Sequence, residues 1–176
     1  MGDRAFIPVR IAVLTVSDSR GLAEDRSGDV LVARLEGAGH LLADRAILPD
    51  ERDQIAAQLR AWVSDPDIDV VISTGGTGLT GRDVTVEAHR DVYEKEIDAF
   101  STLFTMVSVK KIGTSAVQSR ACGGVAGGTY LFALPGSPGA CKDGWDEILQ
   151  PQLDYRHMPC NFVEIMPRLE EHQRRK

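Results

Sequence analysis

The fold is decided by one stretch, Asp69-Val70-Val71-Ile72-Ser73-Thr74-Gly75-Gly76-Thr77-Gly78-Leu79-Thr80-Gly81-Arg82-Asp83. Residues 69–73 are rich in β-branched side chains, which predicts a buried strand. Positions 75–78 include three glycines, which let the backbone adopt positive φ and approach a ligand closely. Successive backbone N–H groups in such a loop can form a concave anion site. The stretch therefore predicts a strand that ends in a phosphate-binding loop, with Asp83 beside a metal ion.

Two further strand–helix units precede this stretch. Residues 10–16 form a nearly continuous apolar run, and residues 40–48 are predicted as a second strand. Apolar residues recur at helical spacing after each of them, and Ser27 is predicted to cap the first of these helices. Strands that alternate with helices across short connections are typical of an α/β protein with a mostly parallel sheet and helices on both faces.

The chain beyond the glycine-rich loop is predicted to be helical at first. Residues 84–93 and 97–109 have helical patterns, and residues 116–121 suggest a short helical turn. Two pairs of glycines, at 123–124 and 127–128, are predicted to frame a turn before a strand over residues 129–134.

A second loop of ligand-binding character follows this last strand, with the sequence Pro135-Gly136-Ser137-Pro138-Gly139. Pro138 suits the first position of a helix and Ser137 its cap, and the same helix start also suits an anion. From Pro159 an extended tail is expected, which ends in the basic residues 174–176. Residues 1–176 are thus predicted as one domain, with a core over about residues 10–162 and a C-terminal tail over residues 163–176.

Composition limits the classes of partner. The formal net charge of −6 argues against broad nucleic-acid binding, which needs a basic face. The same charge repels an anionic ligand, so such a ligand must be held by local dipoles, by a cation or by a few basic side chains. No apolar run reaches the roughly 18 residues that span a bilayer, and the N-terminus lacks a signal-peptide core, so no membrane and a cytoplasmic location are expected. The three cysteines form no Cys-x-x-Cys pair and are predicted as idle thiols.

Four loops that follow predicted strands are expected to meet at one edge of the sheet. They cover residues 17–28, 49–50, 74–83 and 136–139. In open α/β sheets, ligands bind beyond the carboxyl ends of the strands. Asp50 and Asp83 should therefore lie near each other, although each would also be favourable at a helix N-terminus without any ligand.

Other motifs fit the chain less well. Gly76-x-Gly78-x-x-Gly81 matches the dinucleotide fingerprint literally, but the next long segment is helical instead of a strand with an acidic residue. The loop lacks the Lys-Ser/Thr ending of a Walker A motif, and the second loop is no nucleophile elbow. The four histidines are isolated, and His89 is predicted to be solvated.

Six motifs nevertheless occur together in an order known from one family. They are Thr15-Val16-Ser17-Asp18, Asp25-Arg26-Ser27-Gly28, Leu48-Pro49-Asp50-Glu51, Ser73-Thr74-Gly75-Gly76-Thr77-Gly78 with Asp83-Val84-Thr85, Gln118-Ser119-Arg120-Ala121, and Leu134-Pro135-Gly136-Ser137-Pro138. The chain resembles the molybdopterin-binding MoaB/Mog family of molybdenum cofactor biosynthesis proteins over nearly its whole length, from about Arg10 to Phe162. The segments Ile112-Gly113-Thr114-Ser115 and Pro159-Cys160-Asn161-Phe162 are similar to the MoaB branch.

The resemblance implies a three-layer α/β/α sandwich, a homotrimer or homohexamer, and binding of molybdopterin, a pterin dithiolene with a terminal phosphate. In active members that phosphate attacks the α-phosphate of Mg-ATP and gives adenylyl-molybdopterin and pyrophosphate. The family's two essential acidic positions fall on Asp50 and Asp83. Other enzymes of the molybdenum cofactor pathway are candidate partners.

The chemistry of the loops agrees with this activity, since adenylyl transfer mainly requires positioning and charge stabilisation. Mg²⁺ prefers one or two carboxylates plus phosphate oxygens and water, so Asp50 and Asp83 are the predicted catalytic and metal-binding residues. The residues assigned to ATP phosphates are Thr74, Gly75, Gly76, Thr77 and Gly78. Those assigned to molybdopterin are Ser17, Asp18, Asp25, Ser27, Gly136, Ser137 and Pro138.

Two questions stay open at the level of the sequence. One is whether the protein is instead a non-catalytic molybdopterin carrier or scaffold. The other is which loops hold the nucleotide and which hold the pterin.

Overall fold

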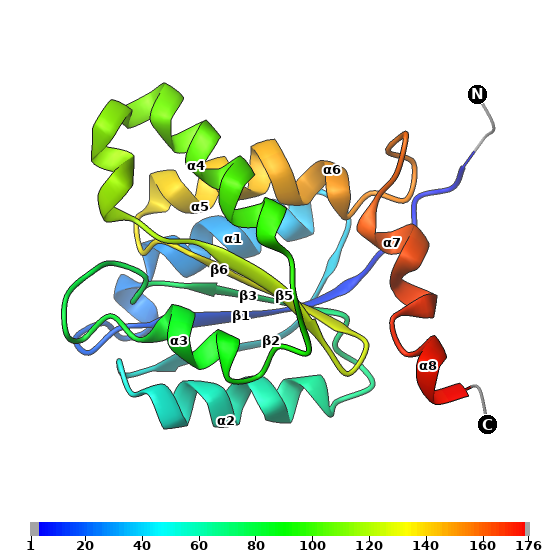
Figure 1. Ribbon diagram of the computed structural model, residues 1–176, viewed down its shortest axis with the longest axis horizontal. Helices are drawn as coiled ribbons and strands as arrows, with labels where there is room; N and C mark the ends of the chain where they lie inside the picture. The colour runs from blue at the N-terminus through cyan, green and yellow to red at the C-terminus, as the bar shows by residue number, and fades with distance from the viewer. Residues whose placement is uncertain (1–3, 175–176) are drawn as a thin grey trace.

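The computed structural model describes residues 4–174, which form a sheet between two layers of helices (Figure 1). Residues 1–3 and 175–176 lie outside the described residues, and with them parts of the N-terminus and of the basic end on which predictions were made. The strands are β1 (Arg10–Val16), β2 (Leu41–Leu48), β3 (Val70–Thr74), β4 (Lys95–Glu96), β5 (Cys122–Ala126) and β6 (Thr129–Leu134). Their order is β2-β1-β3-β6-β5-β4. The first four strands in this order are parallel, while β5 and β4 are antiparallel to their neighbours.

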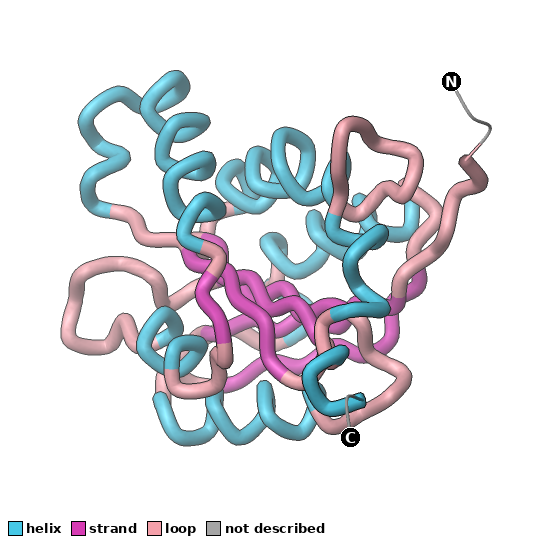
Figure 2. Tube along the Cα trace, turned by 45° about the vertical axis from the view of Figure 1, so that its right-hand side comes forward, coloured by secondary structure: helices cyan, strands magenta, loops and turns pink. Residues whose placement is uncertain are grey.

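Helices cover both faces of this sheet (Figures 1 and 2). The helices are α1 (Arg26–Gly37), α2 (Arg52–Val63), α3 (Thr85–Arg90), α4 (Asp98–Ile112), α5 (Pro138–Gly144), α6 (Gln150–Gln152), α7 (Phe162–Ile165) and α8 (Glu171–Arg174). A π-helical turn over Trp145–Leu149 joins α5 to α6, and α1, α4 and α5 lie on the face opposite α2 and α3. The predicted mostly parallel α/β/α sandwich is confirmed.

The hydrophobic core has two parts, one on each face of the sheet. Successive side chains of a strand point to opposite faces, and helices cover both faces of this sheet. Along β1, Ile11 and Val13 pack with α1 and α5, whereas Ala12 and Leu14 pack with α2. This explains why residues 10–16 are a continuous apolar run without alternation.

The glycine pairs at 123–124 and 127–128 were predicted to frame a turn, but Gly123 and Gly124 lie within β5. A Cβ at Gly123 would come 2.9 Å from the Phe132 ring, and one at Gly124 would come 2.4 Å from the Tyr93 ring. Aromatic rings therefore pack directly over this backbone. Gly127 and Gly128, with φ of 53° and 83°, form the turn between β5 and β6 as expected.

The segment after Pro159 was predicted to be extended, but it is largely helical. Asn161 caps α7 by accepting a hydrogen bond from the Glu164 N–H at 2.8 Å. The buried Val163 joins the core, and the Tyr130 hydroxyl donates to the Phe162 carbonyl oxygen at 2.8 Å. This part of the chain is held by the core and does not hang free of it.

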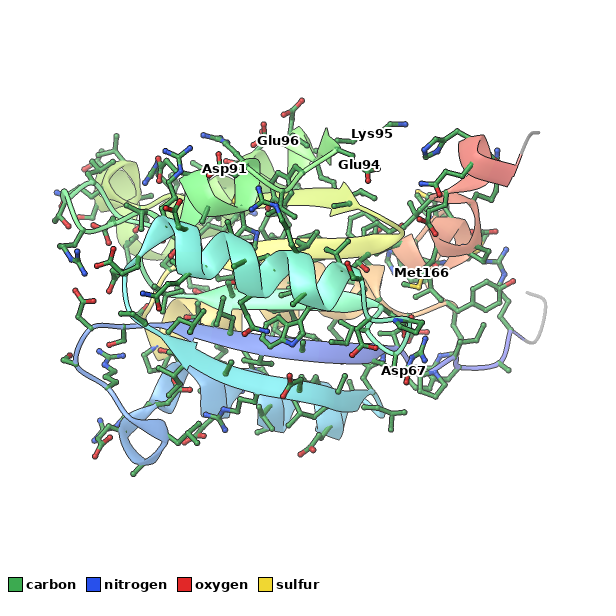
Figure 3. All side chains as sticks on the ribbon, turned by 90° about the horizontal axis from the view of Figure 1, so that it is seen from below. Asp67, Asp91, Glu94, Lys95, Glu96 and Met166 are labelled. Carbon is green, nitrogen blue, oxygen red and sulfur yellow. The ribbon has the colours of Figure 1, made fainter. Side chains whose placement is uncertain are left out.

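The β4 edge of the sheet carries charges that discourage pairing with another strand. Lys95 and Glu96 of β4 are exposed, and Figure 3 shows them with Asp91 and Glu94 along one rim of the molecule. Among residues 4–174, no helix has the length and apolar character needed to cross a membrane.

Candidate functional site

The four loops predicted to meet do lie at one edge of the sheet. Since β1, β2, β3 and β6 are parallel, their carboxyl ends share the edge at the left of Figure 1. The Ser17 N–H donates to the Leu48 carbonyl oxygen at 2.9 Å, and the Gly75 N–H donates to the Leu134 carbonyl oxygen at 3.1 Å. These bonds tie the first loop to the second and the third loop to the fourth.

Close backbone approach explains the start of the glycine-rich loop. Gly75 has φ +96°, and a Cβ there would lie 2.3 Å from the Val16 carbonyl oxygen. The buried Thr74 hydroxyl donates to the Pro135 carbonyl oxygen at 3.0 Å. Thr74 and Gly75 were assigned to ATP phosphates, but the Thr74 hydroxyl and the Gly75 N–H bond to the protein and join two loops.

Asp50 and Asp83 both lie against the glycine-rich loop at this edge, since a Cβ added to Gly76 would come 2.8 Å from Asp50 Oδ1 and one added to Gly78 would come 2.7 Å from Asp83 Oδ2. Burial raises the pKa of Asp50, and the negative charges of Asp18 and Asp83 raise it further, against the opposing effect of Arg82. Asp83 Oδ2 accepts hydrogen bonds from the Thr80 N–H at 2.9 Å and the Thr80 hydroxyl at 2.7 Å. The edge therefore concentrates negative charge that a cation would relieve.

An unpartnered hydroxyl lies in the same place. Thr85 is fully buried, and its Oγ1 has no hydrogen-bond partner among residues 4–174. A Cβ added to Gly76 would lie 2.3 Å from this oxygen and 2.8 Å from Asp50 Oδ1. Both oxygens thus flank a glycine that also has φ +66°. Thr85 was not predicted as a site residue, although it belongs to one of the motifs quoted above.

The carboxylates of Asp50 and Asp83 fit Mg²⁺ better than a metal ion whose ligands all come from the protein. Within residues 4–174 there is no group of three or more His, Cys, Asp and Glu side chains placed to hold a metal ion. A cation beside Asp50 and Asp83 would take its remaining ligands from substrate phosphates and water, which is the common arrangement for Mg²⁺.

Arg82 joins three of the loops at the mouth of the site. Its guanidinium donates to Asp18 at 2.9 and 3.0 Å and to Glu51 at 3.2 Å. Asp18 also accepts the Asp50 N–H at 2.9 Å, and these bonds hold the pKa of Asp18 below its usual range. Arg82 was not predicted as a site residue. The signal was the acidic net charge, which calls for a nearby basic group to hold an anion.

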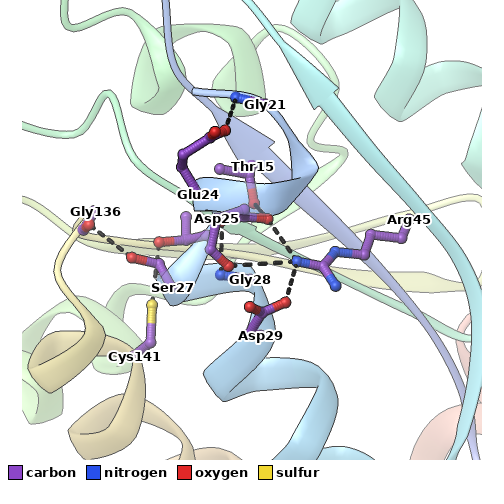
Figure 4. A network of polar contacts seen from close by, with 11 residues as sticks. Thr15, Gly21, Glu24, Asp25, Ser27, Gly28, Asp29, Arg45, Gly136 and Cys141 are labelled. Carbon is purple, nitrogen blue, oxygen red and sulfur yellow. Dashed lines mark hydrogen bonds and ion pairs between the residues drawn. The ribbon is translucent and has the colours of Figure 1, made fainter. Parts of the chain in front are cut away.

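Asp25 supports the first loop from within (Figure 4). Its buried carboxylate accepts hydrogen bonds from Arg45 at 2.8 Å, the Thr15 hydroxyl at 2.7 Å and the Gly28 N–H at 2.9 Å. Burial alone would raise the pKa of Asp25, but these partners together hold it below its usual value. Asp25 therefore caps α1, and the prediction that Ser27 is the cap is wrong.

Ser27 is also buried, and its hydroxyl donates to the Gly136 carbonyl oxygen at 2.7 Å (Figure 4). Asp25 and Ser27 thus stabilise the wall of the site, and the structure does not bring their polar atoms to its surface. The sequence could not separate these roles, because an acid or a serine in a loop suits a cap, a loop contact or a ligand contact equally well.

The other residues assigned to the pterin are accessible. Ser17 and Gly136 are partly buried, whereas Asp18, Ser137 and Pro138 are exposed. Ser137 caps α5 by accepting the Ala140 N–H at 3.1 Å, as predicted. A hollow of about 290 Å³ lies beside Ser137, with Phe104, Lys111, Ser119 and Asp143 among its lining residues.

His89 was predicted to be solvated, and this is wrong because its side chain is fully buried. Its Nε2 lies 2.8 Å from the Ser73 hydroxyl, and its Nδ1 lies 3.0 Å from the Tyr93 hydroxyl. Burial lowers the pKa of His89 to about 3, so the ring is neutral at physiological pH. His89 connects α3 to the end of β3, directly before the glycine-rich loop.

Fold and site together define an open α/β protein with an acidic, glycine-lined edge at the carboxyl ends of its parallel strands, the place where such folds bind ligands. Residues 12–155 match a family described as a probable molybdopterin binding domain. Molybdenum cofactor biosynthesis protein B of Escherichia coli K12 is 48% identical over 157 residues, which cover 89% of this chain and 92% of that protein. The protein of the same name from Bacillus cereus is 40% identical over 148 residues, which cover 84% and 88%.

Solved structures agree with these relatives. A crystal structure of a molybdenum cofactor biosynthesis protein B has a TM-score of 0.86 and 37% identity, with 96% of this chain and 99% of that chain covered. The chain belongs to the molybdopterin-binding family of molybdenum cofactor biosynthesis proteins. The resemblance seen in the sequence is confirmed, and the protein acts in molybdenum cofactor biosynthesis, with molybdopterin as the family's ligand.

Proposed function

We propose that this protein is a molybdopterin adenylyltransferase, which uses Mg-ATP to form adenylyl-molybdopterin and pyrophosphate. The observation that carries the proposal is the meeting of Asp50 and Asp83 beside a glycine-rich loop at the carboxyl edge of the sheet. Two carboxylates next to backbone donors suit a metal–polyphosphate substrate.

The reaction needs no covalent intermediate on the protein. An oxygen of the terminal phosphate of molybdopterin bonds to the α-phosphorus of ATP. The bond from that phosphorus to the oxygen bridging to the β-phosphate breaks, and the electron pair leaves with pyrophosphate. Mg²⁺, held by Asp50 and Asp83, would neutralise charge on the phosphates.

The chain's own groups divide into two sides of one site. On the nucleotide side, the loop N–H groups from Gly76 onward bind phosphate oxygens, and Arg82 offsets the acidic surroundings. On the pterin side, we assign contacts to Ser17, Asp18, Gly136, Ser137 and Pro138. Asp25 and Ser27 hold these loops in register through Arg45 and Gly136.

We also propose that the protein works as a homotrimer or homohexamer. The outward side of α4 carries half-exposed Leu103, Met106, Val109 and Ile112, and apolar patches of this kind often mark contact surfaces. A cytoplasmic location and contact with other enzymes of the pathway remain predictions from the sequence.

The direct test measures pyrophosphate release from Mg-ATP and molybdopterin by the purified protein. Asp83→Asn and Asp50→Asn should each lower turnover by about a hundred-fold or more, because each removes a charge that faces the developing phosphate charge. Asp67→Asn, which removes a carboxylate paired with Arg10 at the opposite edge of the sheet, should retain turnover. Release of no pyrophosphate by a wild-type protein that binds molybdopterin would establish the alternative, a non-catalytic carrier or scaffold.

A thermal melt separates the same alternatives. Any ligand of the native state raises its melting temperature. An adenylyltransferase should be stabilised by Mg-ATP as well as by molybdopterin, whereas a pure pterin carrier should respond to molybdopterin alone.

A further inference from the structure

The guanidinium of Arg120 binds the glycine-rich loop on the side of its carbonyl oxygens. Arg120, in the segment before β5, donates from Nε to the carbonyl oxygens of Thr77 at 3.1 Å and Gly78 at 3.2 Å. Its Nη2 donates to the Asp83 carbonyl oxygen at 3.5 Å. Both terminal nitrogens also donate to the Glu87 carboxylate in the first turn of α3. A single side chain thus binds the loop both in its middle and at its end.

This grip fixes the direction of the loop's N–H groups. In a trans peptide unit the C=O and N–H bonds point in opposite directions. The cis peptide bond found in the described chain is Met158–Pro159, so the units after Thr77 and Gly78 are trans. Since the carbonyl oxygens of these units face Arg120, the N–H groups of Gly78 and Leu79 face the other way.

These donors are free. Within the described residues, the N–H groups of Gly76, Thr77, Gly78 and Leu79 donate to no protein atom. The N–H groups on either side are engaged, that of Gly75 with the Leu134 carbonyl oxygen and that of Thr80 with the Asp83 carboxylate. A run of unpartnered donors in a bent loop is an anion site.

We propose that Arg120 is the positioning residue of this anion site: by binding the loop's carbonyl oxygens it presents the N–H groups of Gly78 and Leu79 to the phosphate chain of a nucleoside triphosphate. The proposal deepens the function proposed above and rests on it only for the identity of the nucleotide. We assign no phosphate contact to Arg120, since four of its five N–H bonds go to three carbonyl oxygens and one carboxylate, and its guanidinium lies on the carbonyl side of the loop.

The residue type matters for this role. Only a planar guanidinium offers several donors in a fixed fork, whereas a lysine ammonium is a compact point charge. Glu87 both orients the fork and neutralises its charge. We therefore expect Arg120→Lys to recover part of what Arg120→Gln loses.

The test uses inorganic pyrophosphate as the probe. Calorimetry measures its affinity, and NMR of ¹⁵N-labelled wild-type protein detects which amide groups it contacts. Pyrophosphate should shift the signals of Gly78 and Leu79. Arg120→Gln should weaken binding by about ten-fold or more, because the donors lose their common direction. Arg34→Gln is the matched control, because the Arg34 side chain is 28% exposed and pairs with Asp146, while that of Arg120 is 29% exposed.

Two results would overturn the proposal: pyrophosphate that leaves the amide signals of Gly78 and Leu79 unmoved, or Arg120→Gln that binds it as wild type does. If Arg120→Gln does not fold, Glu87→Gln gives the second test, since it loosens the guanidinium but leaves it in place, and it should weaken binding less. A protein whose pyrophosphate binding depends on Arg120 but which transfers no adenylyl group would refute the proposed activity and leave this site intact.

Discussion

The buried neutral His89 predicts how the stability of the protein falls in mild acid. Unfolding exposes the ring, whose pKa then returns from about 3 to its ordinary 6.5. The unfolded chain therefore binds a proton at this residue across a pH range in which the folded protein does not. The stability is fully present above pH 6.5 and is lost as the pH falls from there toward about 3.

The size of the effect follows from the two pKa values. Each pH unit within this range costs about 1.4 kcal/mol, so acidification from about pH 7 to about pH 5 should remove about 2 kcal/mol from the free energy of unfolding. For a chain of this length, that loss lowers the melting temperature by about 4–8 °C.

Urea titrations of wild type and His89→Gln at several pH values provide the assay. Glutamine can still bond to Ser73 or Tyr93 but does not titrate, so its stability curve should be flatter in acid by the stated amount. Burial also lowers the pKa of His40, and burial with nearby carboxylates raises the pKa of Asp50, but both groups are present in both proteins and cancel in the difference. Parallel curves for the two proteins between about pH 7 and pH 5 would refute the reasoning.

Three further substitutions test other parts of the structure. Gly76→Ala should abolish the thermal stabilisation by Mg-ATP, because its Cβ would lie 2.3 Å from Thr85 Oγ1 at a positive φ, whereas Gly81→Ala points into open space and should keep it. Asp25→Asn should cost about 3 kcal/mol in urea unfolding because it leaves the Arg45 charge without its buried partner. The exposed Asp29→Asn should cost less than about 1 kcal/mol in the same assay. Tyr130→Phe should lose about 1 kcal/mol and speed proteolysis after residue 160, since the bond to the Phe162 carbonyl oxygen is removed; equal proteolysis rates would contradict this.

The sequence predicted the parts of the fold that backbone physics determines. A continuous β-branched run such as residues 70–72 has few alternatives to a buried strand. Once the strands are parallel, their carboxyl ends must share an edge, so the meeting of Asp50 and Asp83 followed without any knowledge of side-chain packing.

Tertiary partners decided what the sequence could not. Gly123 and Gly124 are glycines because rings from Phe132 and Tyr93 lie over them, and those rings come from other elements. His89 looked solvated because its hydrogen-bond partner Ser73 precedes it by 16 residues. Arg120 was visible only as part of a motif, since its role depends on carbonyl oxygens, which every residue carries.

The backbone origin of the anion site has a consequence for mutational surveys. Alanine at the exposed Leu79 keeps its own N–H, so a side-chain scan should report this position as tolerant even though the proposal has its peptide group bind the ligand. Proline is the one natural residue without that hydrogen. A proline scan, or esters placed in the main chain by synthesis, would reveal contacts that conventional mutagenesis leaves silent.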